Sequence, residues 1–219
     1  MPSVNDVINA FLLVYAGLFP IVNPIGGAPI FLGLTQDCTD KERNALALRV
    51  TRNCFFLLLG SLLAGSYVLE FFGITIPIVR VAGGLVVTAT GWDLLQKGDR
   101  AAERGAHRPV IPTDAFYPLT MPITVGPGSI AVAITFGSQR PRVIDLPDLA
   151  LLGGAAIAGL VAIAATIYVC YRFAEGTVGA LGAHGTNVLV RLSAFLLLCI
   201  GIQIIWNGYS GLVQIAGAG

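Results

Sequence analysis

The sequence has few charged residues. Only 11% of its 219 residues are Asp, Glu, Lys or Arg, 55% are hydrophobic, and the mean hydropathy is +0.80. Ordinary globular domains carry about 25% charged residues, so this composition argues against a water-soluble fold. The 13 lysines and arginines are scattered singly and form no basic stripe, which excludes nucleic acid as a partner. The chain is therefore expected to be an integral membrane protein that has the lipid bilayer as its surroundings.

Six stretches are uncharged or nearly so. They cover residues 7–36, 53–69, 71–92, 115–139, 149–171 and 192–216. A helix needs roughly 20 apolar residues to cross the hydrocarbon, and the continuously apolar run at 55–59 does not alternate as a β-barrel strand would. Asp6 stands where a secretory signal would have Lys or Arg, so the first stretch is expected to stay in the mature protein. The sequence predicts an all-α protein with six transmembrane helices.

The basic residues predict an orientation. The connections after the first, third and fifth spans carry ten of them: Lys41, Arg43, Arg49, Arg52, Lys97, Arg100, Arg104, Arg108, Arg172 and Arg191. The other side carries only Arg80, Arg140 and Arg142. Because positive charge accumulates in cytoplasmic loops, we expect a multi-pass protein with both termini on the non-cytoplasmic side.

The six spans divide into two sets of three, in residues 1–105 and 106–219. An odd number of spans in each half means that the halves insert with opposite orientation. Arg80 and Arg191 each open the third span of a half and precede small residues, which indicates a duplication. We expect these two arginines to anchor their helices by extending toward the interface. The prediction is therefore two inverted three-helix repeats in one transmembrane domain.

Two proline- and glycine-rich segments interrupt the first and fourth spans, at residues 23–29 and 122–129. Proline inside a helix costs roughly 3 kcal/mol, so both helices are expected to break there. Backbone groups freed by a break persist in a bilayer only when they are buried in protein or line a cavity. Half-helices beginning near Gly26 and Gly128 would direct N–H groups at an anionic group such as a carboxylate. Broken helices in equivalent positions of two repeats are typical of a transporter.

The predicted substrate site combines these breaks with nearby polar side chains. Its residues are Asn23, Pro24, Gly26, Gly27, Thr120, Thr124, Gly126, Pro127, Gly128, Ser129, Gln203 and Asn207. The last two lie four positions apart and so share one helical face. Kinks, capping hydroxyls and interface amides also occur in membrane helices that bind nothing, but two breaks in equivalent spans favour a site.

Other kinds of site find little support in the sequence. His107 and His184 fall in expected cytoplasmic loops without a Cys or carboxylate at metal-ligand spacing. The four cysteines, which show no C-x-x-C pattern, are expected to be reduced packing residues: Cys38, Cys54, Cys170 and Cys199. No span contains Asp or Glu, and no Ser or Cys in a span has a His or Asp partner, so neither a carboxylate proton relay nor an enzyme is expected. No cofactor is expected, and the sequence does not choose between coupling to Na⁺, coupling to H⁺ and facilitated passage.

The two interruptions resemble the signature stretches of the MarC family of bacterial and archaeal inner-membrane proteins. The resemblance rests on Asn23-Pro24-Ile25-Gly26, on Gly126-Pro127-Gly128-Ser129, and on further similarity from Glu42-Arg43 to Asn207-Gly208, with the main departure in residues 98–112. It implies six spans and, for some members, transport of small neutral amino acids such as glycine and alanine. We therefore expect a transporter working by alternating access, one half rocking against the other, with a small-molecule substrate held near the midplane.

A small-solute channel, or an exporter of drugs or metabolites, is the alternative function. The sequence leaves open the exact substrate, the direction of transport, the formation of a homo-oligomer and any role in antibiotic resistance.

Overall fold

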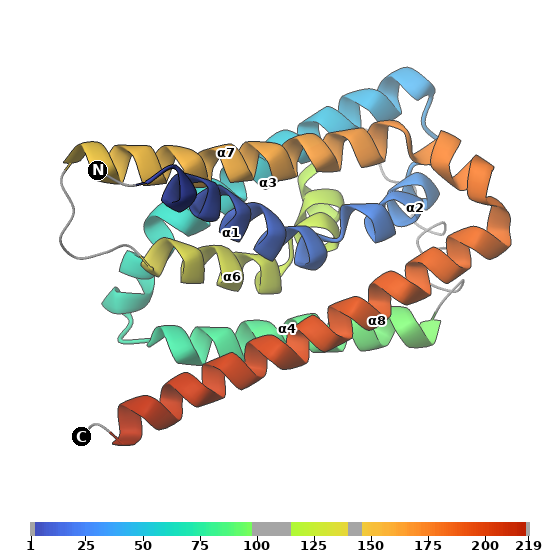
Figure 1. The fold of residues 1–219 in the computed structure, drawn as a ribbon. Helices are drawn as coiled ribbons and strands as arrows, with labels where there is room; N and C mark the ends of the chain where they lie inside the picture. The colour runs from blue at the N-terminus through green and yellow to red at the C-terminus, as the bar shows by residue number, and fades with distance from the viewer. Residues whose placement is uncertain (1–2, 98–114, 140–145, 218–219) are drawn as a thin grey trace.

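The structure, a computed structural model, describes residues 3–97, 115–139 and 146–217, and these residues form helices and short turns without a strand. Along the chain the elements are α1 (Val4–Val22), α2 (Pro24–Leu34), α3 (Asp40–Phe71), α4 (Ile76–Lys97), η1 (Ala115–Thr124), α6 (Pro127–Ser138), α7 (Leu146–Arg172) and α8 (Ala174–Gly217). The helices run roughly along one direction, and both chain termini lie at the same end of the bundle (Figure 1). The expected all-α fold is confirmed.

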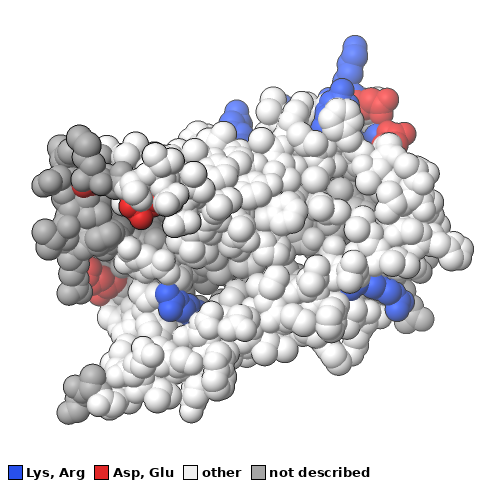
Figure 2. All heavy atoms as spheres, in the orientation of Figure 1, with Lys and Arg blue, Asp and Glu red and all other residues white. Residues whose placement is uncertain are grey.

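Five helices are long and apolar enough to cross a membrane: α1, α3, α4, α7 and α8. A sixth span results if η1 and α6, which meet at 71°, are taken together. Charged side chains lie mostly toward the ends of the helices, with a broad uncharged surface between them (Figure 2). The boundary expected between the repeats, at residue 105, lies outside the described residues, and the inverted repeat stays a prediction.

Two helices extend well beyond the uncharged stretches from which they were predicted. α3 begins at Asp40 instead of residue 53, because Thr39 and Glu42 form a capping box in which the Glu42 side chain accepts from the Thr39 N–H at 2.8 Å. α8 begins at Ala174 instead of residue 192 and bends at Gly182, whose φ of 65° and ψ of 178° belong to a region that essentially only glycine adopts. The predicted sixth span is thus the part of a longer helix that follows this bend.

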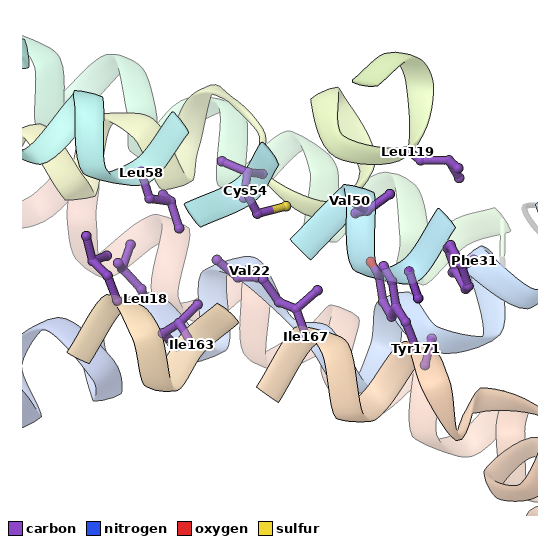
Figure 3. Packing of buried hydrophobic residues seen from close by; sticks show 14 of the residues in the cluster. Leu18, Val22, Phe31, Val50, Cys54, Leu58, Leu119, Ile163, Ile167 and Tyr171 are labelled. Carbon is purple, nitrogen blue, oxygen red and sulfur yellow. The ribbon is translucent and has the colours of Figure 1, made fainter. Parts of the chain in front are cut away.

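One cluster of buried apolar residues lies mainly within α1, α2, α3, η1, α6 and α7, together with Ala174 at the start of α8. Val22, Cys54 and Ile167 lie in the middle of the view in Figure 3. On its right side Phe31 stacks on Tyr171, with ring centroids 4.4 Å apart. Hydrogen bonds also join these helices: Asn53 Nδ2 lies 3.5 Å from Thr120 Oγ1, between α3 and η1. These six elements therefore form the packed core of the protein.

α4 and α8 pack against each other along most of their length, below the other helices in Figure 1. Glycines make this contact close, since a Cβ added at Gly91 would lie 2.6 Å from the Leu198 nitrogen and one at Gly201 would lie 2.6 Å from the Thr88 nitrogen. Gly84 and Gly208 approach the opposite backbone in the same way, near Ile205 and Pro77. Residues with higher numbers on α4 contact residues with lower numbers on α8, so the two helices are antiparallel. Small residues allow such backbone contact in membranes.

Candidate functional site

The first interruption is a single residue, Asn23, between α1 and α2. Its φ of 48° and ψ of 55° are left-handed, a conformation that asparagine tolerates better than most residues, and its side-chain Oδ1 accepts the N–H of Gly26 at 3.2 Å. The second half-helix was expected to begin near Gly26-Gly27, and α2 begins slightly earlier, at Pro24. Proline at the first helical position loses no hydrogen bond, which explains the earlier start. Pro29 lies inside α2 and does not end it.

The second interruption is wider and separates η1 from α6. The backbone of η1 leaves helical geometry at Tyr117 and Met121, each of which precedes a proline. α6 then begins at Pro127, with Gly126 as its cap residue and no capping side chain. Here too the half-helix begins slightly earlier than Gly128, where it was expected. The N-terminus of α6 thus keeps backbone N–H groups that no cap side chain satisfies.

A cavity of about 340 Å³ lies where the two interruptions face α4 and α8. It is lined by eight of the twelve predicted site residues: Asn23, Gly26, Gly27, Thr124, Gly126, Pro127, Gly128 and Ser129. The opposite wall comes from Val86, Val87, Thr90 and Leu94 of α4 and from Leu197 of α8. The structure therefore brings the two sequence-distant breaks to one hollow.

The structure places the other four predicted residues away from this cavity. Pro24 is buried at the first position of α2. Thr120 is buried within η1 and donates to the Ala115 carbonyl at 2.7 Å. Gln203 and Asn207 are exposed on α8 and bond to each other at 3.0 Å. They do share a helical face as expected, but that face does not contribute to the cavity.

The cavity has no charged side chain among its lining residues, so helix ends and polar groups determine its electrostatics. The N-terminus of α2 is already occupied by the Asn23 side chain, whereas that of α6 is not. Ser129 is 2% exposed and lines the cavity one turn into α6. The partial positive charge at this helix end and the Ser129 hydroxyl can therefore bind a small anionic group such as a carboxylate.

Tyr171 of α7 is a site residue that the sequence analysis did not identify. Its hydroxyl oxygen lies 2.8 Å from Thr124 Oγ1, and a Cβ added at Gly27 would lie 3.0 Å from the Tyr171 hydroxyl oxygen. Tyr171 thus packs behind both breaks at once, buried to 1% exposure. Its side chain fixes the position of α2 relative to η1, and with it the shape of the cavity wall.

Replacing Tyr171 by phenylalanine is expected to lower the free energy of unfolding by about 1 kcal/mol. The ring would keep its stacking on Phe31, and Thr124 would keep its bond to the Leu119 carbonyl at 2.7 Å, so only the link between α7 and η1 is lost. Thermal unfolding in detergent measures the effect. Tyr168→Phe is the matched control, because Tyr168 is only partly buried in the same helix and its hydroxyl makes no hydrogen bond within the described residues. Equal melting temperatures for the two variants would contradict this role.

Two substitutions at Asn23 distinguish the effect of its left-handed backbone from the effect of its amide side chain. Asn23→Ala is expected to lower the free energy of unfolding by roughly 2 kcal/mol, because it removes the cap and strains a left-handed residue. Asn23→Gly relieves the strain and should cost only a few tenths. Thermal unfolding measures both effects, and equal losses of stability for the alanine and glycine variants would contradict this role of the left-handed backbone.

The remaining candidates stay outside the site. His184 lies on α8, exposed, instead of in a loop as expected, and His107 falls outside the described residues. The described cysteines are free, and burial raises the pKa of the Cys38 thiol, which lies between α2 and α3. Within the described ranges, no group of three or more His, Cys, Asp or Glu residues could hold a metal ion.

The spanning helices define an α-helical, multi-pass integral membrane protein with an uncharged cavity at two helix breaks. Residues 8–213 match the MarC family integral membrane protein model, and the chain belongs to that family. It is 32% identical to the inner membrane protein MarC of Salmonella typhimurium over 95% of this chain and 98% of the relative. The MarC proteins of Citrobacter koseri and Escherichia coli are 31% and 30% identical, with the same coverage. The membrane is thus an inner membrane. No solved structure matches the chain.

Proposed function

We propose that this protein transports small neutral amino acids, such as glycine and alanine, across the inner membrane by alternating access. The observation that carries the proposal is the uncapped N-terminus of α6, which faces an uncharged cavity of about 340 Å³ between two helix breaks. Backbone dipoles at broken helices bind zwitterions in transporters without requiring charged side chains. A cavity without charged side chains selects against substrates with a net charge.

Both charges of an amino acid find partners in this cavity. The carboxylate would accept from the N–H groups at Gly128 and Ser129 and from the Ser129 hydroxyl. The ammonium group would lie at the C-terminal end of α1, whose last residues Ile21 and Val22 also line the cavity. Carbonyl oxygens at a helix C-terminus carry partial negative charge, which suits a cation. Val86 and Val87 leave room for a short apolar side chain.

We further propose that six spans are arranged as two inverted halves. Support comes from the contacts between spans: the first span (α1 and α2) packs on α7 as the fourth span (η1 and α6) packs on α3, and α2 packs on α8 as α6 packs on α4. If the two halves are exchanged, each of these contacts becomes its counterpart. Gly84 and Gly91 of α4 lie seven positions apart, as do Gly201 and Gly208 of α8. The two breaks then occupy equivalent places, and the cavity lies near the midplane.

Uptake of labelled alanine and glycine into proteoliposomes tests the transport proposal. Saturation and counterflow are expected for a carrier, whereas flux that rises linearly with concentration would indicate a channel. Imposing a Na⁺ gradient and a pH gradient separately identifies the coupling ion. Protein-free liposomes and a Gly126→Leu variant are the controls. Uptake equal to that of empty liposomes for every amino acid would overturn the proposal.

A further inference from the structure

We propose that α4 and residues 183–217 of α8 move as one rigid body against the core, and that this motion opens and closes the cavity. We call α4 and residues 183–217 the paired helices. The proposal rests on the proposed transport function and specifies its motion. The moving boundary separates one helix of each half from the other helices, so it differs from the expected rocking of one half against the other.

The first argument is the packing within the paired helices. Gly84, Gly91, Gly201 and Gly208 bring the two backbones into contact, with Cβ positions 2.6–2.9 Å from backbone atoms of the opposite helix. These contacts extend over residues 77–91 of α4 and 194–211 of α8, and within these ranges they leave no space for one helix to move relative to the other. Closely packed elements of this kind move together.

The second argument is that the core is held together without the paired helices. None of the buried residues in the apolar cluster comes from α4 or residues 183–217. Tyr15 bonds Thr166 between α1 and α7, and Thr124 bonds Tyr171 between η1 and α7. On the paired helices, by contrast, the Thr88 and Thr90 hydroxyls bond carbonyls of their own helix. The hydrogen bonds Tyr15–Thr166 and Thr124–Tyr171 thus join core helices to one another.

The third argument is the position of the cavity between the two bodies. Its core wall consists of α1, α2, η1 and α6 residues around the two breaks, and its other wall consists of Val86, Val87, Thr90, Leu94 and Leu197. α4 rests on α6 beside the cavity through small residues, with a Cβ at Gly83 meeting the Ala131 side chain. The nearest atoms at this contact are side-chain atoms, the Ala131 Cβ and the Val87 Cγ2. The contacts of Gly91 and Gly201 in the paired helices, by contrast, include backbone atoms of the opposite helix. Displacement of the paired helices would therefore change the cavity directly.

The fourth argument is the way in which the chain enters the paired helices. Among the described residues only two glycines have positive φ, namely Gly73 before α4 and Gly182 within α8. At both positions an added Cβ would meet no atom within 4 Å. The start of α8 is fixed to the core, because Ala174 is fully buried there and Glu175 pairs with Arg43 of α3 at 2.8 Å. The chain thus passes from core to paired helices through an unpacked glycine on each side, as expected for hinges.

Distances between spin labels in lipid nanodiscs test the motion without relying on transport. The native cysteines are first replaced by serine or alanine, and labels are attached at exposed positions. The pairs are Val161–Ile202 between the bodies, Phe56–Val161 within the core and Trp92–Val213 within the paired helices. We expect a broad or two-peaked distance distribution for Val161–Ile202 and a single narrow distribution for each of the other two pairs. Free alanine, added as the substrate, should shift only the Val161–Ile202 distribution. An equally narrow distribution for all three pairs, with and without alanine, would overturn the proposal.

Substitution of the hinge glycines links the motion to transport. Gly182→Ala and Gly73→Ala touch no neighbouring atom but disfavour the positive φ, so the uptake rate should fall roughly five- to tenfold. The alanine-dependent shift of the melting temperature, which reports binding, should persist. Gly179→Ala and Gly60→Ala are the matched controls, since an added Cβ is equally free there and φ is not positive. Hinge variants with wild-type uptake would contradict the proposed hinges. Absence of uptake in the wild-type protein, with two-peaked label distances, would instead remove the proposed substrate and leave the motion standing.

Discussion

Leucine in place of Gly126 is expected to reduce amino acid uptake to background while the protein stays folded. Gly126 lines the cavity and caps α6, and a Cβ there would meet only the Pro122 carbonyl oxygen, at 3.3 Å. Its φ of −92° and ψ of 178° are open to any residue, so the backbone is not strained. The leucine side chain would extend into the free space beside the first turn of α6 and exclude a carboxylate from its N–H groups.

Uptake into proteoliposomes and thermal unfolding in detergent measure this prediction together. Gly60→Leu is the control, because Gly60 lies on α3 with open space around its Cβ and away from the cavity. The control should transport normally, and both variants should melt close to the wild-type temperature. Normal uptake by the Gly126→Leu protein would show that the substrate does not bind at the start of α6.

Features that depend on neighbouring residues in the sequence were predictable. Long uncharged stretches identify membrane helices because charge is expensive in hydrocarbon. Asn23-Pro24 and Gly126-Pro127 identify the breaks because proline lacks the N–H that a continuing helix requires. The half-helix expected to begin near Gly26 begins at Pro24, because proline at the first helical position loses no hydrogen bond.

Helix ends outside the membrane were harder to predict, because hydropathy does not distinguish a polar helix from a loop. The first turns of α3 are charged, yet Thr39 and Glu42 have the spacing of a capping box, a signal that the sequence offers and that was not used. At the start of α8, Ala174 and Glu175 are held by the core and by Arg43, contacts with no trace in the local sequence. The sequence does not distinguish Gly182, where α8 bends, from the many other glycines of the chain.

The cavity residues around the two breaks were predictable from the sequence, whereas the wall formed by α4 and α8 was not. Tyr171 reaches Thr124 across 47 positions of sequence, so no local pattern reveals it. Gln203 and Asn207 looked equally suited to a site, but the face of α8 that meets α4 is set by Gly201 and Gly208, and the amides lie on another face. Glycine spacing, and not the position of polar groups, decides which side of this helix points inward.

Gly201 is therefore the position where substitution should damage the fold most. A Cβ there would lie 2.4 Å from Thr88 Oγ1 and 2.6 Å from the Thr88 backbone nitrogen. A backbone atom cannot move aside as a side chain can, so leucine would force α4 and α8 apart and open the other glycine contacts with them. Overpacking usually costs about 1–3 kcal/mol, and we expect Gly201→Leu to exceed this range because several contacts are lost together.

Gly179→Leu provides the comparison within the same helix, since an added Cβ at Gly179 meets no atom within 4 Å. Yield from membranes, monodispersity in detergent and melting temperature should be nearly normal for Gly179→Leu and strongly reduced for Gly201→Leu. Gly201→Ala should fall between them, because its single methyl group already meets the Thr88 backbone. If Gly201→Leu were as stable as Gly179→Leu, α4 and α8 could not be in backbone contact, and they would then lack the rigidity needed to move as one body.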